Sequence, residues 1–293
     1  MAVRYDQIAE RLRAYRLGKG LSTDEVALRL GLSRAAIYRL EKGGLIKIET
    51  LERVADLLGV SLASLLDAGV EYHSNAVSFL ERMRQIEMTS GRVLAHYEPI
   101  SFVLSSDDYN GHLRQMLLET SSVTASKEDF KRQIEDVLRI LSERKIQIRQ
   151  RQPNIASIIG LLEIERFLRL GLVGRLDLPL AVQKQRRQAA AMEVERIARF
   201  MEQEPVGIQI GLVEGAVPSQ TFQIFRRDEG ALVSVSPYRL GELPNITTGV
   251  AIVTASDEAV ALHEAMFSQL WNQAVRGSAG AAILRKLIKR TSA

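Results

Sequence analysis

Apolar residues recur at helical spacing along the first part of the chain. Ile8, Leu12 and Tyr15 follow i, i+4, i+7 spacing and so share one face of a helix. A helix is expected to end at Gly59, and another before Gly69. Gly69 is the last residue of the segment 67–69, which closes the first domain. Outside the central motif, the pattern predicts three helices, over 4–17, 48–58 and 61–67.

The central motif, residues 22–43, has the pattern of two short helices joined by a tight turn. Ser22 and Ser33 stand where a helix N-cap is needed, and Glu25 completes an S-x-x-E capping box with Ser22. Gly31 falls at the reversal, where a positive φ is least costly without a Cβ. The expected apolar seam between the helices consists of Val26, Ala27, Leu30, Leu32, Ile37 and Leu40. The exposed face of the second helix is then small and basic, made of Arg34, Ala35, Tyr38, Arg39 and Lys42.

The middle of the chain also has helical periodicity, interrupted at two places. A long helix is predicted from Glu71 to about Tyr97, and residues 98–104 then break the pattern. Residues 105–108 suit a turn and a helix N-cap. Further helices are expected near 108–120, 126–150, 154–171 and 179–203.

After Pro205 the apolar residues alternate with a period of two, which indicates strands. The predicted strands lie at 207–213, 221–225, 231–235 and 249–254. Ser256 caps a closing helix on which Trp271 is interpreted as core or as dimer interface, and a last basic helix is expected at about 280–290. The predicted fold is an all-α five-helix domain over 1–69, followed by an α+β domain over 70–293 with helices, a small mainly antiparallel sheet and closing helices.

Composition narrows the class of protein. The 293 residues can bury a large core, and the absence of cysteine excludes disulfides and is consistent with a reducing cytoplasm. No signal-peptide pattern and no apolar run of membrane-spanning length is present, so we expect a cytoplasmic protein without a membrane partner. The net charge of +4 is mildly favourable for binding nucleic acid.

Residues 8–66 resemble the helix-turn-helix domain of the lambda/434 repressor and Cro group, the xenobiotic-response-element family. The resemblance runs through residues 21–27, Gly31-Leu32-Ser33 and residues 37–43, and ends in residues 48–51 and 57–62 of the following helices. One position departs from the family: Thr23 stands where a glutamine is usual, and its shorter side chain weakens the expected bracing of the second helix. The resemblance implies a sequence-specific DNA-binding domain.

The exposed basic face of residues 34–42 predicts specific contacts with DNA. Arg34 and Arg39 point outward and are expected to donate to guanine O6 and N7 in the major groove. The family alignment adds Ala35 as a base-reading position, which suits contact with a thymine methyl. Residues that flank this face are expected to hold phosphates, namely the side chains of Thr23, Tyr38, Lys42 and Lys47 and open backbone N–H groups of Gly43 and Gly44. The family pattern also implies an internal ion pair between Arg16 and Glu41.

The C-terminal part has a second resemblance, between Phe222 and Ala274. The order of a Phe-x-Ile-Phe strand, a second strand, a Gly-Val-x-Ile-Val strand and a helix ending in Leu-Trp-x-x-Ala is similar to ligand-sensing domains of bacterial and archaeal regulators that are related in fold to phospholipase D. Phospholipase chemistry requires His-x-Lys pairs. No histidine of this chain is followed two residues on by lysine, so the resemblance implies a binding domain without catalysis.

The sequence therefore predicts a transcriptional regulator, a dimeric repressor that binds double-stranded DNA at an inverted-repeat operator. Residues 70–293 are expected to dimerise and to sense a small-molecule effector in an apolar pocket, walled by helices around 155–172 and by the sheet over 208–253. No metal, cofactor or catalytic motif is found. His263-Glu264, for example, lacks the second histidine of a helical zinc site. The alternatives are a constitutive DNA-binding dimer, an antitoxin-like autorepressor without ligand, and an enzyme with an accessory DNA-binding domain.

Overall fold

The computed structural model describes residues 5–44, 47–66, 69–120 and 127–292. Three predicted helices have one end outside these described residues. They are the start at Arg4 of the helix 4–17, the end of the helix 61–67 with residues 67–68 of the closing segment, and the start at Ser126 of the helix 126–150.

The described residues before Val70 form a helical domain, as the periodicity predicts. Its helices are α1 (Tyr5–Gly18), α2 (Thr23–Leu30), α3 (Arg34–Leu40), α4 (Ile48–Leu58) and α5 (Leu62–Leu66). One apolar cluster unites them. Ile8, Leu12 and Tyr15 of α1 are buried in it together with Ile37 of α3 and Val54 of α4. The hydrophobic effect of burying this shared face is what holds such short helices in place, because each is too short to be stable alone.

The rest of the described chain is built around one seven-stranded mixed sheet. Its strands are β1 (Val70–His73), β2 (Ser90–His96), β3 (Asn154–Gly160), β4 (Ile208–Val213), β5 (Thr221–Arg227), β6 (Gly230–Ser236) and β7 (Ala251–Thr254). They lie in the order β1-β7-β6-β5-β2-β3-β4. The β2–β3 and β3–β4 pairs are parallel, and the other pairs are antiparallel.

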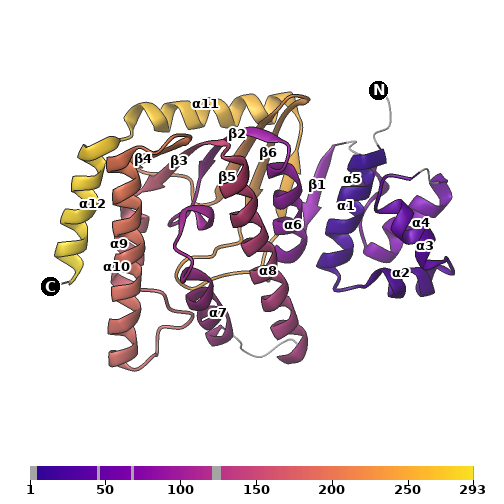
Figure 1. Cartoon of the computed structure of the whole chain (residues 1–293), viewed down its shortest axis with the longest axis horizontal. Helices are drawn as coiled ribbons and strands as arrows, with labels where there is room; N and C mark the ends of the chain where they lie inside the picture. Colours follow the sequence, from indigo (N-terminus) through magenta and orange to yellow (C-terminus); the bar gives the residue numbers. More distant parts are fainter. Residues whose placement is uncertain (1–4, 45–46, 67–68, 121–126, 293) are drawn as a thin grey trace.

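Helices cover both faces of this sheet (Figure 1). One face packs against α11 (Asp257–Gln273), whose Phe267 and Leu270 meet Leu94 and Ile224 of the sheet. The opposite face carries the larger core. The elements that contribute to that core are α6 (Ala76–Glu87), η1 (Phe102–Leu104), α7 (Tyr109–Glu119), α8 (Lys127–Arg151), α9 (Leu161–Leu170), α10 (Leu180–Gln203) and α12 (Gly277–Ser292).

The predicted fold class is confirmed, but two predicted helices are wrong. The segment from Glu71 to Tyr97 is not one helix: it forms β1, α6 and β2. The segment 154–171 begins with β3, and only its second half is the helix α9. In both cases tertiary pairing overrides local periodicity, since β2 and β3 pair with each other and each also pairs with a second strand, β5 or β4.

The helical domain lies at one end of the molecule and α12 at the other (Figure 1). Helix α1 packs along α6, and α5 contacts β1, so the two parts of the chain meet across a contact that is continuous with both cores.

Candidate nucleic-acid interface

The geometry of α2 and α3 follows the capping signals of the sequence. The Glu25 N–H donates to Ser22 Oγ at 3.1 Å, and the Ser22 N–H donates to the Glu25 carboxylate at 2.7 Å, which completes the capping box. Gly31 has φ +64° and ends α2, while the Ala36 N–H donates to Ser33 Oγ at 3.1 Å at the start of α3. The predicted caps and turn are therefore confirmed, and they fix where α3 begins.

Packing decides which face of α3 is left for DNA. Ile37 and Leu40 are buried against Val26, Ala27 and Leu30 of α2. The residues left exposed are those of the predicted basic face: Arg34, Ala35, Tyr38, Arg39 and Lys42. A short helix with one buried and one basic exposed face is the form of a recognition helix that enters a major groove.

The two candidate base-reading arginines differ in their surroundings. Arg34 is 75% exposed and its Nε lies 3.1 Å from Asp24 Oδ1, so it must leave this ion pair to reach a base. Arg39 is exposed, and no described carboxylate forms an ion pair with it. A guanidinium that must first break an ion pair with a carboxylate loses part of the free energy that it gains by binding guanine. Arg39 has no such pair to break, so it is the stronger candidate for reading a base.

The candidate phosphate-binding residues surround this face. Lys42 and Lys47 are exposed, and Tyr38 lies between Lys42 and the centre of α3, with the Lys42 Nζ 5.6 Å from its ring centroid. Thr23 is half-buried at the first turn of α2. This arrangement surrounds the base-reading residues with donors of the kind that fix a protein on the DNA backbone.

The prediction that the backbone N–H groups of Gly43 and Gly44 are open to DNA is wrong. The Gly43 N–H donates to Leu40 O at 3.2 Å, and the Gly44 N–H donates to Arg39 O at 2.9 Å, so both satisfy carbonyls at the end of α3. Both glycines instead serve the turn. Gly43 has φ +80°, and a Cβ at Gly44 would lie 2.9 Å from the Arg39 carbonyl oxygen.

Replacement of Lys42 by alanine is expected to reduce the salt dependence of DNA binding. Losing one phosphate contact releases about one counterion fewer, so the slope of log K against log salt should shrink by roughly one unit, equally for operator and random DNA. Binding titrations at several salt concentrations measure this slope. Lys289→Ala, which removes an exposed lysine from the far helix α12, is the control and should leave the slope unchanged. An unchanged slope in the Lys42 variant would remove this residue from the phosphate contacts.

Arg16 and Glu41 meet in the structure. The Arg16 Nε and Nη2 donate to the two carboxylate oxygens of Glu41, the second at 2.9 Å, and Nη1 donates to Leu21 O at 2.7 Å. Both side chains are only 9% exposed. This bidentate pair joins α1 to the end of α3 and to the loop before α2, so it sets the position of the recognition helix.

A second buried charge cluster joins the helical domain to the rest of the molecule. Arg11 of α1 and Arg82 of α6 both donate to the carboxylate of Glu71 in β1, with Nε–O distances of 2.8 Å. The three side chains are 2%, 2% and 4% exposed. Burial alone raises the pKa of Glu71, but Arg82, His73 and Arg11 outweigh burial and hold this pKa well below its usual value. The carboxylate is thus charged and bound on both sides.

Other contacts surround this cluster and extend the connection. The Gln85 side chain donates to Glu10 O at 3.0 Å, and the ring of His73 stacks on Tyr15 with 5.0 Å between centroids. Burial lowers the pKa of His73, which favours its neutral form. Sequence analysis missed this interface, because nothing local to Arg11 or Glu71 distinguishes them from solvated charges.

The predicted pocket between residues 155–172 and the sheet is not apolar. A polar cleft of about 460 Å³ lies there, and its wall contains Ile155 and Ile210 from the predicted walls together with Arg92, Gln209 and Arg276. The other expected wall residues, Ile159 and Phe167, are packed in the large core. An apolar cavity of only about 50 Å³ lies beside Phe79 and Tyr97.

Comparison with known proteins bears on the N-terminal domain only. A helix-turn-helix family model matches residues 12–65. None of the proteins with curated descriptions matches the chain. The chain thus contains a helix-turn-helix DNA-binding domain, which supports a role in transcription regulation.

Among the described residues, no group of three or more histidine, aspartate or glutamate side chains is placed to hold a metal ion. None of the described helices is long and apolar enough to cross a membrane.

Proposed function

We propose that the protein is a sequence-specific transcriptional repressor that binds an inverted-repeat operator as a homodimer. The exposed basic face of α3, with Arg39 open to solvent, is the observation that carries this proposal. A single helix-turn-helix domain covers too few base pairs for useful specificity, and a two-fold dimer doubles the site that is read.

Residues 70–293 supply dimerisation and effector sensing in this proposal. The buried contact of α1 with α6 and β1 favours it, because a domain that is firmly attached transmits a change of dimer geometry to the DNA-binding helices. An effector alters DNA affinity only by favouring one geometry over another. The proposal assigns the protein no cofactor and no catalytic activity, and places it in the cytoplasm.

We further propose that the C-terminal domain is related in fold to the phospholipase-D-like sensing domains of regulators. The strands β5, β6 and β7 followed by α11 have the order on which that resemblance rests. Its histidines have other partners than a catalytic lysine: His96 contacts the carbonyls of Ile158 and Pro218, and His263 contacts that of Ala259. A binding domain without phospholipase chemistry is consistent with these contacts.

A footprint of the full-length protein on its own promoter tests the DNA-binding function, and Arg39→Ala tests the reading face. The variant should lose about 1–3 kcal/mol of operator affinity, because one arginine–guanine contact is lost, and should relax specificity at one base pair. Affinity for random DNA should change much less. Equal losses on operator and random DNA would show that Arg39 contacts only the backbone, and the absence of any protected site would contradict the function itself.

Homodimeric binding predicts a strict dependence on half-site spacing. Half-site centres should lie about one helical turn, roughly 10 base pairs, apart or a multiple of that. Inserting about 5 base pairs between the half-sites turns them to opposite sides of the duplex and should reduce binding to that of a single half-site. Insertion of a full turn is the control, since it keeps the half-sites on one side. Sedimentation of the protein–DNA complex should give two protomers per operator; a single protomer bound at full affinity would refute the dimer.

A further inference from the structure

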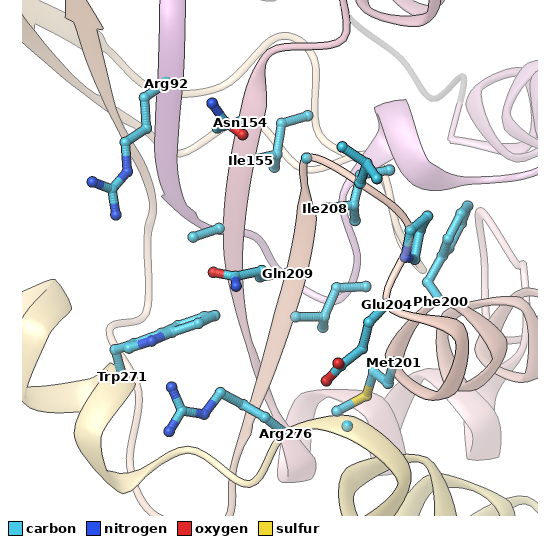
Figure 2. Close-up of a pocket in the computed structure, with 16 residues that line it drawn as sticks. Arg92, Asn154, Ile155, Phe200, Met201, Glu204, Ile208, Gln209, Trp271 and Arg276 are labelled. Carbon is cyan, nitrogen blue, oxygen red and sulfur yellow. The ribbon is translucent and has the colours of Figure 1, made fainter.

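A polar cleft of about 460 Å³ lies at the edge of the sheet formed by β4, between the end of α10 and the end of α11, at the starts of β2, β3 and β4 (Figure 2). Arg92 of β2, Asn154 of β3 and Gln209 of β4 line it from the sheet, and Trp271 near the end of α11 and Arg276 just before α12 line the other side. An adjoining hollow of about 260 Å³ has Arg92, Gln209 and Trp271 in common with it and adds Arg226. The two together are of the size that encloses a small organic molecule.

The strand register places like charges side by side at this cleft. Arg92 is paired across β2 and β5 with Arg226, and across β2 and β3 with Asn154. Like charges directly opposite each other on neighbouring strands destabilise a sheet. Arg226 is neutralised by Glu264 at 2.6 Å, whereas no described carboxylate forms an ion pair with Arg92. The sheet therefore retains an uncompensated positive charge at the cleft.

Arg276 adds a second such charge from the opposite wall. Its guanidinium lies over the Trp271 ring, 5.3 Å from the centroid, and no described carboxylate forms an ion pair with it. In Figure 2 the Arg92 guanidinium and the Gln209 amide lie on one side of the Trp271 ring and the Arg276 guanidinium lies on the other, so the cleft has one arginine on each side of this ring. Glu204 also lines the cleft, but its carboxylate lies at the start of α12, 3.0 Å from where a Cβ of Gly277 would stand.

Trp271 is held in place as part of the wall. Phe267 stacks on it with 5.6 Å between centroids, and its ring edge rests on β4 at Gly211, where a Cβ would lie 3.1 Å from Trp271 Cζ3 and 2.8 Å from Ala274 Cβ. A side chain at position 211 would push the ring away, so glycine is needed there. Trp271 is the one tryptophan of the chain, and its fluorescence therefore reports on this cleft alone.

We propose that the cleft binds a small organic anion, whose carboxylate or phosphate oxygens are bound by Arg92 and Arg276 on the two sides of Trp271. Guanidinium groups bind such oxyanions by paired, charge-assisted hydrogen bonds. The Asn154 and Gln209 amides would hydrogen-bond the uncharged part of the ligand. The cleft has room for a molecule larger than an inorganic ion, so we expect the ligand to have such a part. This proposal rests on the effector-sensing function, for which it names the class of effector.

Tryptophan fluorescence of the full-length protein provides the test. The probes are benzoate, 3-phosphoglycerate and adenosine monophosphate, each with its neutral counterpart, benzamide, glycerol or adenosine, and inorganic phosphate alone. At least one organic anion should change the Trp271 emission saturably and raise the melting temperature, and its neutral counterpart should do neither. No response to any of the organic anions, or a response to inorganic phosphate only, overturns the proposal.

Variants then assign the site. Arg92→Ala and Arg276→Ala should each weaken binding of the active anion by at least about tenfold, because each removes charge-assisted hydrogen bonds. Arg92→Lys should fall between, since it keeps the charge and loses the paired geometry. Arg132→Ala, on the exposed side of α8, is the matched control and should bind as the wild type does. Unchanged binding by both cleft variants, with wild-type circular dichroism, also overturns the proposal.

Operator titrations with and without the active anion separate this proposal from the function on which it rests. A change in operator affinity supports both. Anion binding without such a change supports the site and contradicts its role as a sensor. Anion binding by a protein that protects no DNA site supports the cleft and overturns the regulator function.

Discussion

Replacement of Glu71 by alanine is expected to lower the free energy of unfolding by about 3–5 kcal/mol, the range measured when one partner of a buried ion pair is removed. The carboxylate lies between Arg11 and Arg82, and all three side chains are almost completely buried. Removing it takes away the carboxylate that the two buried guanidinium groups share, and leaves the partly exposed Glu10, 3.3 Å from Arg82, as a carboxylate beside them. Denaturant unfolding followed by circular dichroism measures the loss.

Two comparisons show whether unpaired charge is the cause. Glu214→Ala, at an exposed position after β4, should change the stability little. A triple variant that combines Arg11→Met, Glu71→Leu and Arg82→Met should recover much of the loss, because none of the three buried charges then remains. A Glu71→Ala protein as stable as the wild type would mean that water or another carboxylate replaces Glu71 at this interface.

The same carboxylate should make the protein sensitive to acid. Because the folded state holds the pKa of Glu71 well below its usual 4.5, its stabilising contribution is complete above that usual value. The contribution is lost as the pH falls through the lower, folded pKa. The difference in stability between wild type and Glu71→Gln should therefore be greatest near neutral pH and shrink in strong acid.

The helix-turn-helix domain was predictable because its signals are local. The Ser22–Glu25 capping box, the positive φ of Gly31 and the Ser33 cap each act within a single turn of the chain, so the sequence contains the whole cause. The strands β4 to β7 were predictable for a similar reason. Apolar residues alternate along β4, β5 and β6, for example Ile208, Ile210 and Leu212, and glycines stand at or near the starts of β4, β6 and β7, although four successive residues are buried in both β4 and β5.

The strands β1, β2 and β3 were missed because their pairing is not local. β3 runs directly into α9 at Gly160, and both its faces are buried, so its apolar residues form a continuous run that also fits a helix. β1 is four residues long and is paired with β7, which lies far along the chain from it. Periodicity within a window of residues does not detect such a partner.

The contact between the two parts of the chain was beyond sequence analysis for the same reason. Arg11 is one of several charged residues on α1, and nothing in its neighbours sets it apart from the exposed Arg13. Arg11 differs from Arg13 because it lies at the contact with β1, where it binds Glu71. Sequence analysis predicted Glu71 at the start of a long helix and so gave Arg11 no partner. The polar character of the cleft at Arg92 was missed likewise, because its polar side chains come from β2, β3, β4 and the segment after α11 and gather only in the folded sheet.

The second large effect is expected for Glu41→Ala, in the ion pair that positions the recognition helix. Arg16 and Glu41 are each 9% exposed, and Arg16 also donates to Leu21 O, so the guanidinium cannot turn to solvent without losing a second bond. The variant should lose about 3 kcal/mol of stability in the helical domain, because a buried arginine is left unpaired. It should also bind the operator more weakly, since α3 is no longer tied to α1.

Hydrogen exchange of the α1 and α3 amides measures this loss where it occurs. Exchange in α3 should accelerate in Glu41→Ala and much less in Glu41→Gln, which keeps an oxygen acceptor toward Arg16. Glu52→Ala, at an exposed position of α4, is the control and should exchange as the wild type does. Because Arg39 and Lys42 keep their chemistry in Glu41→Ala, weaker operator binding with unchanged salt dependence would assign the effect to the position of α3. If exchange in α3 does not change, the pair does not hold the recognition helix in place.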